Sequence, residues 1–502
     1  MKDIVTELTH YCAILIIVTY VIGSVAIAFK CSDKNDRANT RMYGVSLFCA
    51  IIFLQILFGL NSYIMTLDVR MFAFYGAHMI YLVATFVLFR IFYSKGSVIL
   101  LDHMLFLLTI GLTMVSRISF DKGIRQFELI VLSTILAGLI PFIMSKFKLL
   151  RKMAWLYGAV GIGLLVLVLI KGTNTYGAKL SMEIFGVAFQ PSEFVKVVFV
   201  FFVAAMFEHD SGFKTIIKTS IMAAAHVLIL AASRDLGSAL IYAIVYVMIV
   251  FVASGKAIYL LCGLFGGVGA SLAGYHLFEH VKVRVAAWIN PWSDIEGKGY
   301  QMAQSLFSIA TGGFAGMGLY KGSPRTIPVV EKDFIFSAMA EEFGGIICIG
   351  IVIVMFLCVY LMIKAAWESH GRFYRYMALG LGVTYGIQIF ITIGGAIKLI
   401  PSTGVTLPLI SYGGSSMLAT VAMFSIVQGI IILKRDEDDK IEKAKLEKAR
   451  REKERREKAR LEDSKAEKSR EAKEQSKKSK SSKEREGNSE NNKYSGKRKG
   501  NK

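Results

Sequence analysis

Cysteine and proline are scarce in this chain, with six cysteines and seven prolines among 502 residues. No cysteine belongs to a CxxC pair or to a histidine-paired cluster, so the sequence suggests neither a disulfide framework nor a zinc site. The sequence also lacks the GxxxxGKS/T pattern and any GxGxxG that closes a strand and opens a helix, so no nucleotide-binding site is readable. The chain is instead rich in long apolar runs.

These apolar runs recur over the first 434 residues. Hydrophobic residues make up 54% of the chain and the mean hydropathy is +0.51, which is too apolar for an ordinary soluble domain. The first run is followed by a basic flank and not by a small-residue cleavage site, which favours an anchored helix over a removed signal peptide. We predict an all-α polytopic membrane protein with about thirteen spans, at residues 11–29, 43–66, 71–93, 98–117, 126–146, 153–171, 191–208, 215–232, 237–254, 257–278, 334–363, 376–399 and 412–434.

The distribution of lysine and arginine predicts the orientation. The basic connections at 30–41, 146–152 and 364–375 are expected on the cytoplasmic side, and the three assignments agree when the spans are counted through. The N-terminus of this cytoplasmic-membrane protein is then outside, the C-terminus is cytoplasmic, and the connection 281–333 is extracytoplasmic.

Six of the seven prolines lie in or beside connections on the predicted outer face. Non-helical backbone near membrane depth is tolerated where it is buried in protein or lines a cavity. We therefore expect the irregular segments 177–193, 281–333 and 400–416 to pack together. The alternative is that these prolines only terminate helices.

The passage 281–344 is the only long polar, glycine-rich and proline-bearing stretch between two apolar runs. Energy for group transfer on an outer face must arrive in the substrate, for example as a lipid-linked diphosphate. Such a reaction needs a carboxylate to accept the proton of the acceptor hydroxyl, and cations for the departing diphosphate. Asp294, which follows a Pro-Trp turn, suits the first role. Alternatively, it caps the following helix or closes an Asx-turn.

Basic side chains of the same loop are candidates to meet a diphosphate, with arginine best suited to bidentate contact: Arg284, Lys298, Lys321, Arg325 and Lys332. For each of them, loop solvation or headgroup contact is the alternative. Acids at the edge of a bilayer are costly and need partners, which concerns Glu193, Asp235, Asp333, Glu341 and Glu342. Lys196 is the expected partner of Glu193, at the i,i+3 spacing on one helix.

The C-terminal segment has a different composition. Lys and Arg outnumber Asp and Glu there by roughly ten, with hardly any apolar residue after Leu461. No sustained heptad predicts a coiled coil. We expect a solvated segment, partly helical or disordered, near anionic lipid headgroups. Interleaved acids and the lack of aromatic residues argue against nucleic-acid binding.

Four ordered motifs carry a family resemblance. They are Gln190–Glu193 (QPSE), the Asn290–Asp294 turn with Gly297–Gln301, the run Asp333–Ser337 with Ala340–Gly344, and Pro401–Gly404 leading into Leu407–Ser416. Together they resemble the SEDS (shape, elongation, division and sporulation) glycosyltransferases, the RodA, FtsW and SpoVE family. The resemblance implies three parts: extra N-terminal transmembrane helices at 1–95, a SEDS-type ten-helix core at 96–434 with its large extracytoplasmic loop at 279–333, and the charged cytoplasmic tail at 435–502.

The resemblance also implies an activity, the polymerisation of lipid II into peptidoglycan glycan strands. It places the family's essential loop aspartate on Asp294, which would activate the acceptor hydroxyl while undecaprenyl diphosphate leaves. The residues and the resemblance together give these candidates for binding the substrate or its diphosphate: Arg284, Lys298, Lys179, Lys196, Glu193, Ser192, Gln304, Asp333, Glu341, Ser411, Ser415 and Ser416. The implied partners are lipid II, the growing glycan strand, membrane lipids and a class B penicillin-binding transpeptidase. A divalent cation, Mg²⁺ or Mn²⁺, is expected from the family alone.

The chain departs from the family pattern at several positions. Leu180 and Ser181 stand where the family commonly has Arg-Trp, and Ser233-Arg234 replaces a Gln-Pro pair before Asp235. Two other functions stay open. The first alternative is a flippase for lipid-linked precursors, because such a transporter also needs many helices, a polar cavity and buried acids. A catalytically silent scaffold of cell-wall assembly is the third reading.

Overall fold

The computed structural model describes residues 2–30, 37–175, 178–184 and 187–495. Residues 1–434 form one compact unit and residues 435–502 a second. Among the described residues, twelve helical segments are long and apolar enough to cross a membrane. The predicted class, an all-α polytopic membrane protein, is therefore confirmed.

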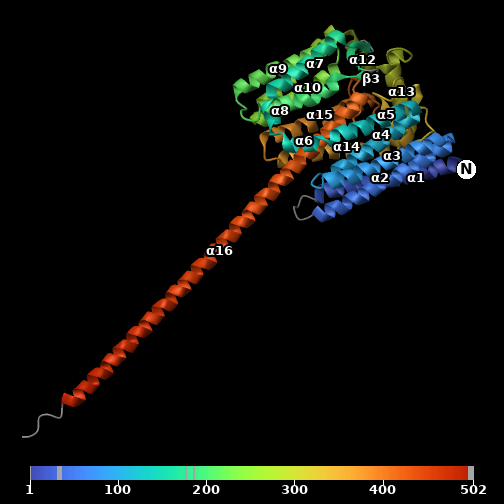
Figure 1. The fold of residues 1–502 in the computed structure, drawn as a ribbon. Helices are drawn as coiled ribbons and strands as arrows, with labels where there is room; N and C mark the ends of the chain where they lie inside the picture. The colour runs from blue at the N-terminus through green and yellow to red at the C-terminus, as the bar shows by residue number, and fades with distance from the viewer. Residues whose placement is uncertain (1, 31–36, 176–177, 185–186, 496–502) are drawn as a thin grey trace, which may run out of the picture. The chain divides into compact units, whose positions relative to one another are not determined.

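Within the first unit most helices run side by side (Figure 1). The chain order is α1 Lys2–Lys30, α2 Arg37–Thr66, α3 Val69–Phe92, α4 Val98–Ile118, α5 Phe120–Gly138, α6 Ile140–Lys146, η2 Lys148–Lys152, α7 Ala154–Lys171, α8 Pro191–Met206, α9 Phe213–Ala232, α10 Leu236–Ser254, α11 Ile258–Leu277, α12 Glu279–Ile289, η3 Pro291–Asp294, α13 Tyr300–Gly312, η4 Pro324–Thr326, α14 Ile335–Glu368, α15 Arg372–Ala396 and α16 Gly414–Ser495.

The predicted spans correspond to these helices, although several helices extend beyond the predicted limits and span 126–146 covers both α5 and α6. Span 191–208 is α8, which has 16 residues, or about 24 Å of helix, shorter than the roughly 30 Å of a bilayer's hydrocarbon core. The predicted loop 279–333 contains helices α12 and α13 and two short 3₁₀ turns. Polar side chains set several helix starts, because Ser97, Ser119 and Asp235 each accept a backbone N–H in the first turn that follows.

A small sheet replaces part of the predicted irregular segment 177–193. Strands β1 (Thr173–Thr175), β2 (Ala178–Ile184) and β3 (Val187–Phe189) pair in the order β1-β2-β3. Both pairings are antiparallel, with Thr173 opposite Ser181 and Met182 opposite Phe189. The all-α prediction missed this sheet, because strands this short carry too few residues for an alternating apolar pattern.

The N-terminal helices pack against the rest of the first unit. Helix α1 lies along α14, and α2 lies along α4. As a result, every residue of α4 except Val98 and Arg117 is buried. Helix α4 is therefore enclosed by other helices over almost its whole length.

Helix α14 is bent at Gly344, whose backbone angles (φ 83°, ψ 170°) are not helical. The segment after α13 is hydrogen-bonded to this bend: Met317 N–H donates to the Glu341 carbonyl at 3.0 Å and Gly345 N–H to the Gly313 carbonyl at 2.9 Å. The bend thus fixes the path of the loop that leads to residue 333.

The three irregular segments expected to pack together do so. The Gln190 N–H donates to Ser415 Oγ at 2.9 Å. The Tyr412 N–H donates to the Glu331 carbonyl at 2.8 Å, and Ser411 Oγ donates to the carbonyl of Lys332. These contacts confirm the clustered arrangement and place polar backbone from distant parts of the chain at one end of the bundle.

Candidate active site

The first turn of α8 carries one half of a buried polar cluster. Pro191 begins the helix, where a missing N–H costs nothing. Ser192 Oγ accepts from Gln190 Nε2 at 3.2 Å and donates to Asp235 Oδ2 at 2.9 Å. The Tyr242 hydroxyl donates to the Ser192 carbonyl at 2.9 Å. The α8 start is therefore fixed against the start of α10.

Glu193 and Lys196 form the ion pair that their spacing predicted. Lys196 Nζ lies 2.7 Å from Glu193 Oε2, and only 3% and 6% of the two residues is exposed. The approach lacks hydrogen-bond geometry at that oxygen, so the contact is ionic. Lys196 Nζ also donates to Gln388 Oε1 at 2.8 Å. A buried pair of this kind is held by its further hydrogen bonds.

Gln388 of α15 extends the cluster toward the last irregular segment. Its Nε2 donates to the Thr406 carbonyl at 3.0 Å, and the Thr406 hydroxyl donates to Ser416 Oγ at 2.9 Å. The sequence reasoning missed Gln388. A buried amide inside an otherwise apolar predicted span is the signal that could have found it.

Asp333, Arg284 and Asp235 form the other half of the cluster. The Arg284 guanidinium interacts electrostatically with both carboxylates. Gly404, with φ +78°, lies between the partners: a Cβ there would be 3.2 Å from Arg284 Nη2 and 3.6 Å from Asp333 Oδ2. Glycine is required at this position both by the backbone angle and by the close approach.

Burial governs the protonation of this trio. Burial raises the pKa of Asp333 to about 6, while Arg284 opposes the rise. Burial also raises the pKa of Asp235, against the hydrogen bonds from Ser238 and Ser192, and lowers the pKa of Arg284, against the attraction of Asp333 and Asp235. A carboxylate with a pKa near 6 beside a cation is suited to accept a proton near neutral pH.

Asp294 lies in different surroundings. It is exposed, at the end of η3, and its Oδ2 accepts the backbone N–H of Lys298 at 3.0 Å. The preceding turn is closed by Asn290, whose Oδ1 accepts the Trp292 N–H at 3.2 Å. This is the turn-closing geometry that the sequence left open as the alternative to catalysis.

The cluster brings together many of the predicted binding residues: Ser192, Glu193, Lys196, Arg284, Asp333, Ser411, Ser415 and Ser416. Lys298 is exposed beside Asp294, and Gln304 is half-buried on α13. Glu341 accepts the Ser323 N–H at 2.7 Å and so supports a neighbouring loop. The backbone of Lys179 lies in β2, and its side chain lies outside the described residues.

The donor set does not suggest a bound metal ion. The described parts of the chain contain no group of three or more histidine, cysteine, aspartate or glutamate side chains that could hold one. The residues therefore do not fit the divalent cation that the family resemblance allowed as a protein-held group, and no step below is assigned to it.

Relatives of known sequence and structure agree with this architecture. RodA of Mycobacterium tuberculosis, a peptidoglycan glycosyltransferase, is 34% identical over 270 residues, which cover 51% of this chain and 58% of that protein. The chain thus spans less than two thirds of the length of this relative. The probable peptidoglycan glycosyltransferase FtsW of Pseudoalteromonas translucida is 31% identical over 352 residues, covering 66% of this chain and 87% of that protein.

Two solved structures share the fold. A chain of a peptidoglycan synthase complex that coordinates polymerization and crosslinking is 25% identical, with a TM-score of 0.58 over 67% of this chain and 97% of that one. Rod shape determining protein RodA of Thermus thermophilus is 24% identical, with a TM-score of 0.52 over 67% and 96%. The sequence model of the FtsW, RodA and SpoVE cell cycle proteins matches residues 97–435. The chain therefore belongs to this family.

Proposed function

We propose that the protein is a peptidoglycan glycosyltransferase that polymerises lipid II into glycan strands at the outer face of the cytoplasmic membrane. The observation that carries the proposal is the half-buried Asp333 carboxyl beside Arg284, within a cluster built from separate parts of the chain. Relatives named as peptidoglycan glycosyltransferases support the reaction class.

In this mechanism Asp333 is the general base. Its carboxylate accepts the proton of the acceptor sugar hydroxyl as that oxygen attacks the anomeric carbon of the second lipid-linked sugar. The new glycosidic C–O bond forms while the bond from the anomeric carbon to the diphosphate oxygen breaks. Undecaprenyl diphosphate leaves with the bonding electron pair, and the proton remains on Asp333 until solvent removes it.

Cations of the cluster meet the developing negative charge. Arg284 offers a planar guanidinium suited to bidentate contact with phosphate oxygens. Lys196 is bound to Glu193 and Gln388, and it contributes a fixed positive charge in a buried setting. Charge stabilisation by groups that are already in place is usually the largest single contribution to catalysis.

Asp294 is the rival base, supported by its place in the loop and by the motif resemblance. Asp333 is preferred because it is half-buried beside a cation and its pKa is raised, whereas Asp294 closes an exposed turn. The two assignments predict different losses of glycan polymerisation when each carboxylate is removed.

The test uses full-length protein purified in detergent, with labelled lipid II as substrate. Asp333→Asn is expected to reduce glycan polymer formation by at least about 100-fold, the lower range for loss of a general base. Asp294→Asn is the matched control and is expected to retain activity within a few fold. Thermal unfolding of each variant shows whether the fold is retained.

Other outcomes would select another reading. Normal polymerisation by Asp333→Asn, with loss in Asp294→Asn, would transfer the catalytic role to the loop turn. Transport of labelled lipid II across proteoliposomes without polymer would support the flippase. On the proposed function, the protein works beside a class B penicillin-binding transpeptidase, as the related synthase complex couples polymerization to crosslinking.

A further inference from the structure

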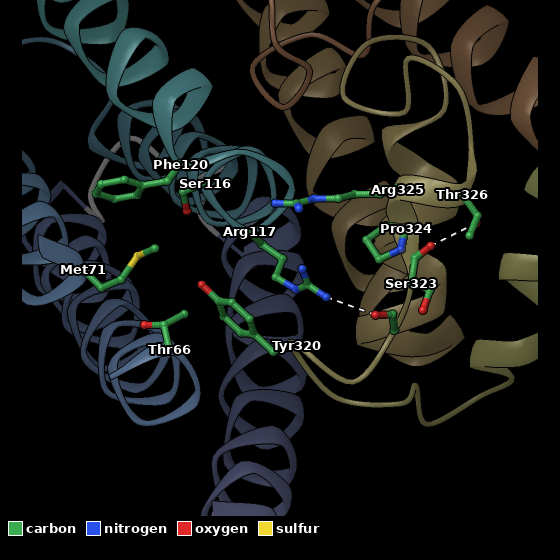
Figure 2. Close-up of a pocket in the computed structure, with 11 residues that line it drawn as sticks. Thr66, Met71, Ser116, Arg117, Phe120, Tyr320, Ser323, Pro324, Arg325 and Thr326 are labelled. Carbon is green, nitrogen blue, oxygen red and sulfur yellow. Dashed lines mark hydrogen bonds between the residues drawn. The ribbon is translucent and has the colours of Figure 1, made fainter. Parts of the chain in front are cut away.

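A cavity of about 520 Å³ lies where the N-terminal helices meet the rest of the first unit. Thr66 at the end of α2 and Met71 of α3 form one wall. Arg117 of α4, Tyr320 and residues 322–326 form the other, and Phe120 of α5 also lines the cavity (Figure 2). None of the residues in the Asp333 cluster lines this cavity, so it is a second polar site.

Two arginines give the cavity a positive charge. Arg117 is held in place: its Nε donates to Glu342 Oε1 at 2.9 Å and its Nη2 to the Gly322 carbonyl at 3.0 Å. Arg325 reaches toward α4 (Figure 2), and its Nε donates to the Ile118 carbonyl at 2.7 Å. Among the described residues Arg325 has no carboxylate partner, while Glu342 pairs with Arg117 and Glu341 accepts the Ser323 N–H behind the lining.

Tyr320 contributes an unused hydroxyl. Its ring lies under Arg117, with the guanidinium carbon 4.6 Å from the ring centre. Its hydroxyl oxygen is buried and has no hydrogen-bond partner among the described residues. The backbone is left-handed at Tyr320, with φ +74°, an unfavourable conformation for a bulky residue that needs support from its surroundings. Tyr320 therefore contributes its ring, under Arg117, and its buried hydroxyl to the lining of the cavity.

The surface beside the cavity is apolar. The turn and the helix that supply Thr66 and Met71 also expose Leu67, Val69 and Phe72, each with more than 60% of its surface accessible. Paired guanidinium groups with hydroxyl donors match the oxygens of a phosphate group, for which arginine is well suited. An adjoining apolar surface matches acyl chains.

We propose that this cavity binds the phosphate group of an anionic lipid. The lipid would bridge α2 and α3 to the 320–326 loop. The Ser323 N–H of that loop donates to Glu341 of α14 at 2.7 Å, and Arg117 of α4 joins the Gly322 carbonyl of the loop to Glu342 of α14. The occupied cavity thereby fastens the N-terminal helices to the loop that leads to Asp333. Free phosphate shares the chemistry, and the experiment below separates the two sources.

Native mass spectrometry of the full-length protein in detergent tests the proposal, with phosphatidylglycerol and phosphatidylcholine as probes. Phosphatidylglycerol is expected to bind more tightly than the zwitterionic lipid. Arg325→Gln is expected to weaken phosphatidylglycerol binding about tenfold, the effect of losing a hydrogen bond to a charged group. Tyr320→Phe, which keeps the ring under Arg117, is expected to weaken it less.

The matched control is Lys321→Gln, which removes one charge from the same loop. Lys321 does not line the cavity, and its Nζ lies 3.4 Å from Glu7 Oε1 of α1. Unchanged phosphatidylglycerol binding in both Arg325→Gln and Tyr320→Phe would overturn the proposal, as would an equal loss in Lys321→Gln. Thermal stabilisation of the wild type by inorganic phosphate, but not by phosphatidylglycerol, would overturn the lipid as the source.

Discussion

Partial burial raises the pKa of Asp333 to about 6, and Arg284 limits that rise by favouring the charged form. The two side chains therefore depend on each other. A base must be deprotonated to act, so the same balance sets the lower pH limit of the proposed reaction.

The rate of glycan polymerisation by the wild type is expected to fall as the pH drops below about 6, because the carboxylate of Asp333 becomes protonated there. Arg284→Gln removes a cation that lowers this pKa, so the acidic limb is expected to move to higher pH, in addition to a lower maximal rate. Initial rates with labelled lipid II between pH 5 and pH 9 give both quantities. An acidic limb that stays in place after the substitution would contradict the assigned coupling.

Residue spacing in the sequence was enough to predict the Glu193–Lys196 pair of the site, but it could not predict the proximity of Arg284 to Asp333. The Glu193–Lys196 pair follows from i,i+3 geometry on a single helix. The proximity of Arg284 to Asp333 depends on how α12, the 320–334 loop and Gly404 pack. No sequence periodicity contains that information. Sequence reasoning therefore listed Arg284 and Asp333 only as separate binding candidates, and it predicted Asp294, which follows a recognisable turn, as the catalytic carboxylate.

At the scale of elements, the bend in α14 has a steric cause. A Cβ at Gly344 would lie 2.2 Å from the Gly316 backbone nitrogen and 2.4 Å from the Ala315 carbonyl carbon. Backbone atoms cannot move aside as a flexible side chain can. The bend and the adjoining loop therefore depend on the absence of a side chain at this position.

Gly344→Ala is expected to destabilise the protein strongly, because it combines a positive φ with a backbone clash. Gly350→Ala on the same helix is the matched control, since a Cβ there meets only the Ile17 and Val21 side chains, at 3.3 Å. Thermal unfolding in detergent is expected to show a much lower midpoint for Gly344→Ala and a small change for Gly350→Ala. Equal midpoints for the two variants would refute the steric account.

Most spanning helices could be predicted because about 20 consecutive apolar residues allow few other structures. The short strands β1–β3 could not, since their pairing is set by antiparallel partners and not by a long pattern. The helix expected after Asp294 is α13, whereas α12 was hidden within a polar stretch, where hydropathy gives no signal. Amphipathic pieces in a long connection require tertiary contacts to define them.

At the scale of the whole chain, the distribution of basic residues predicts which end of the bundle faces the cytoplasm. On that basis we expect the Asp333 cluster to be extracytoplasmic and the charged segment 435–502 to be cytoplasmic. This orientation is required by the proposed function, because the site must be on the side where the glycan strands are assembled.

Cysteine labelling tests the orientation. In a cysteine-free background, Ser293→Cys in the exposed η3 turn is expected to react with a membrane-impermeant maleimide on intact cells. Ser464→Cys in the exposed tail is expected to react only after the membrane is permeabilised. The reverse pattern would place the Asp333 cluster on the cytoplasmic side and exclude the proposed reaction there.

The enclosure of α4 by the N-terminal helices has a consequence for biogenesis. Asp102 and His103 of α4 are fully buried, and the Tyr20 hydroxyl of α1 lies 2.9 Å from His103 Nδ1. Facing acyl chains, an aspartate costs roughly 2.5–3.5 kcal/mol at the centre of a helix, and Asp102, the fifth residue of α4, costs a part of that at insertion. Helix α4 therefore enters the bilayer with two polar side chains, Asp102 and His103, that would be unfavourable against acyl chains. The earlier helices cover these side chains. The N-terminal helices therefore assist the membrane insertion of α4, the first helix of the part of the chain that matches the family model.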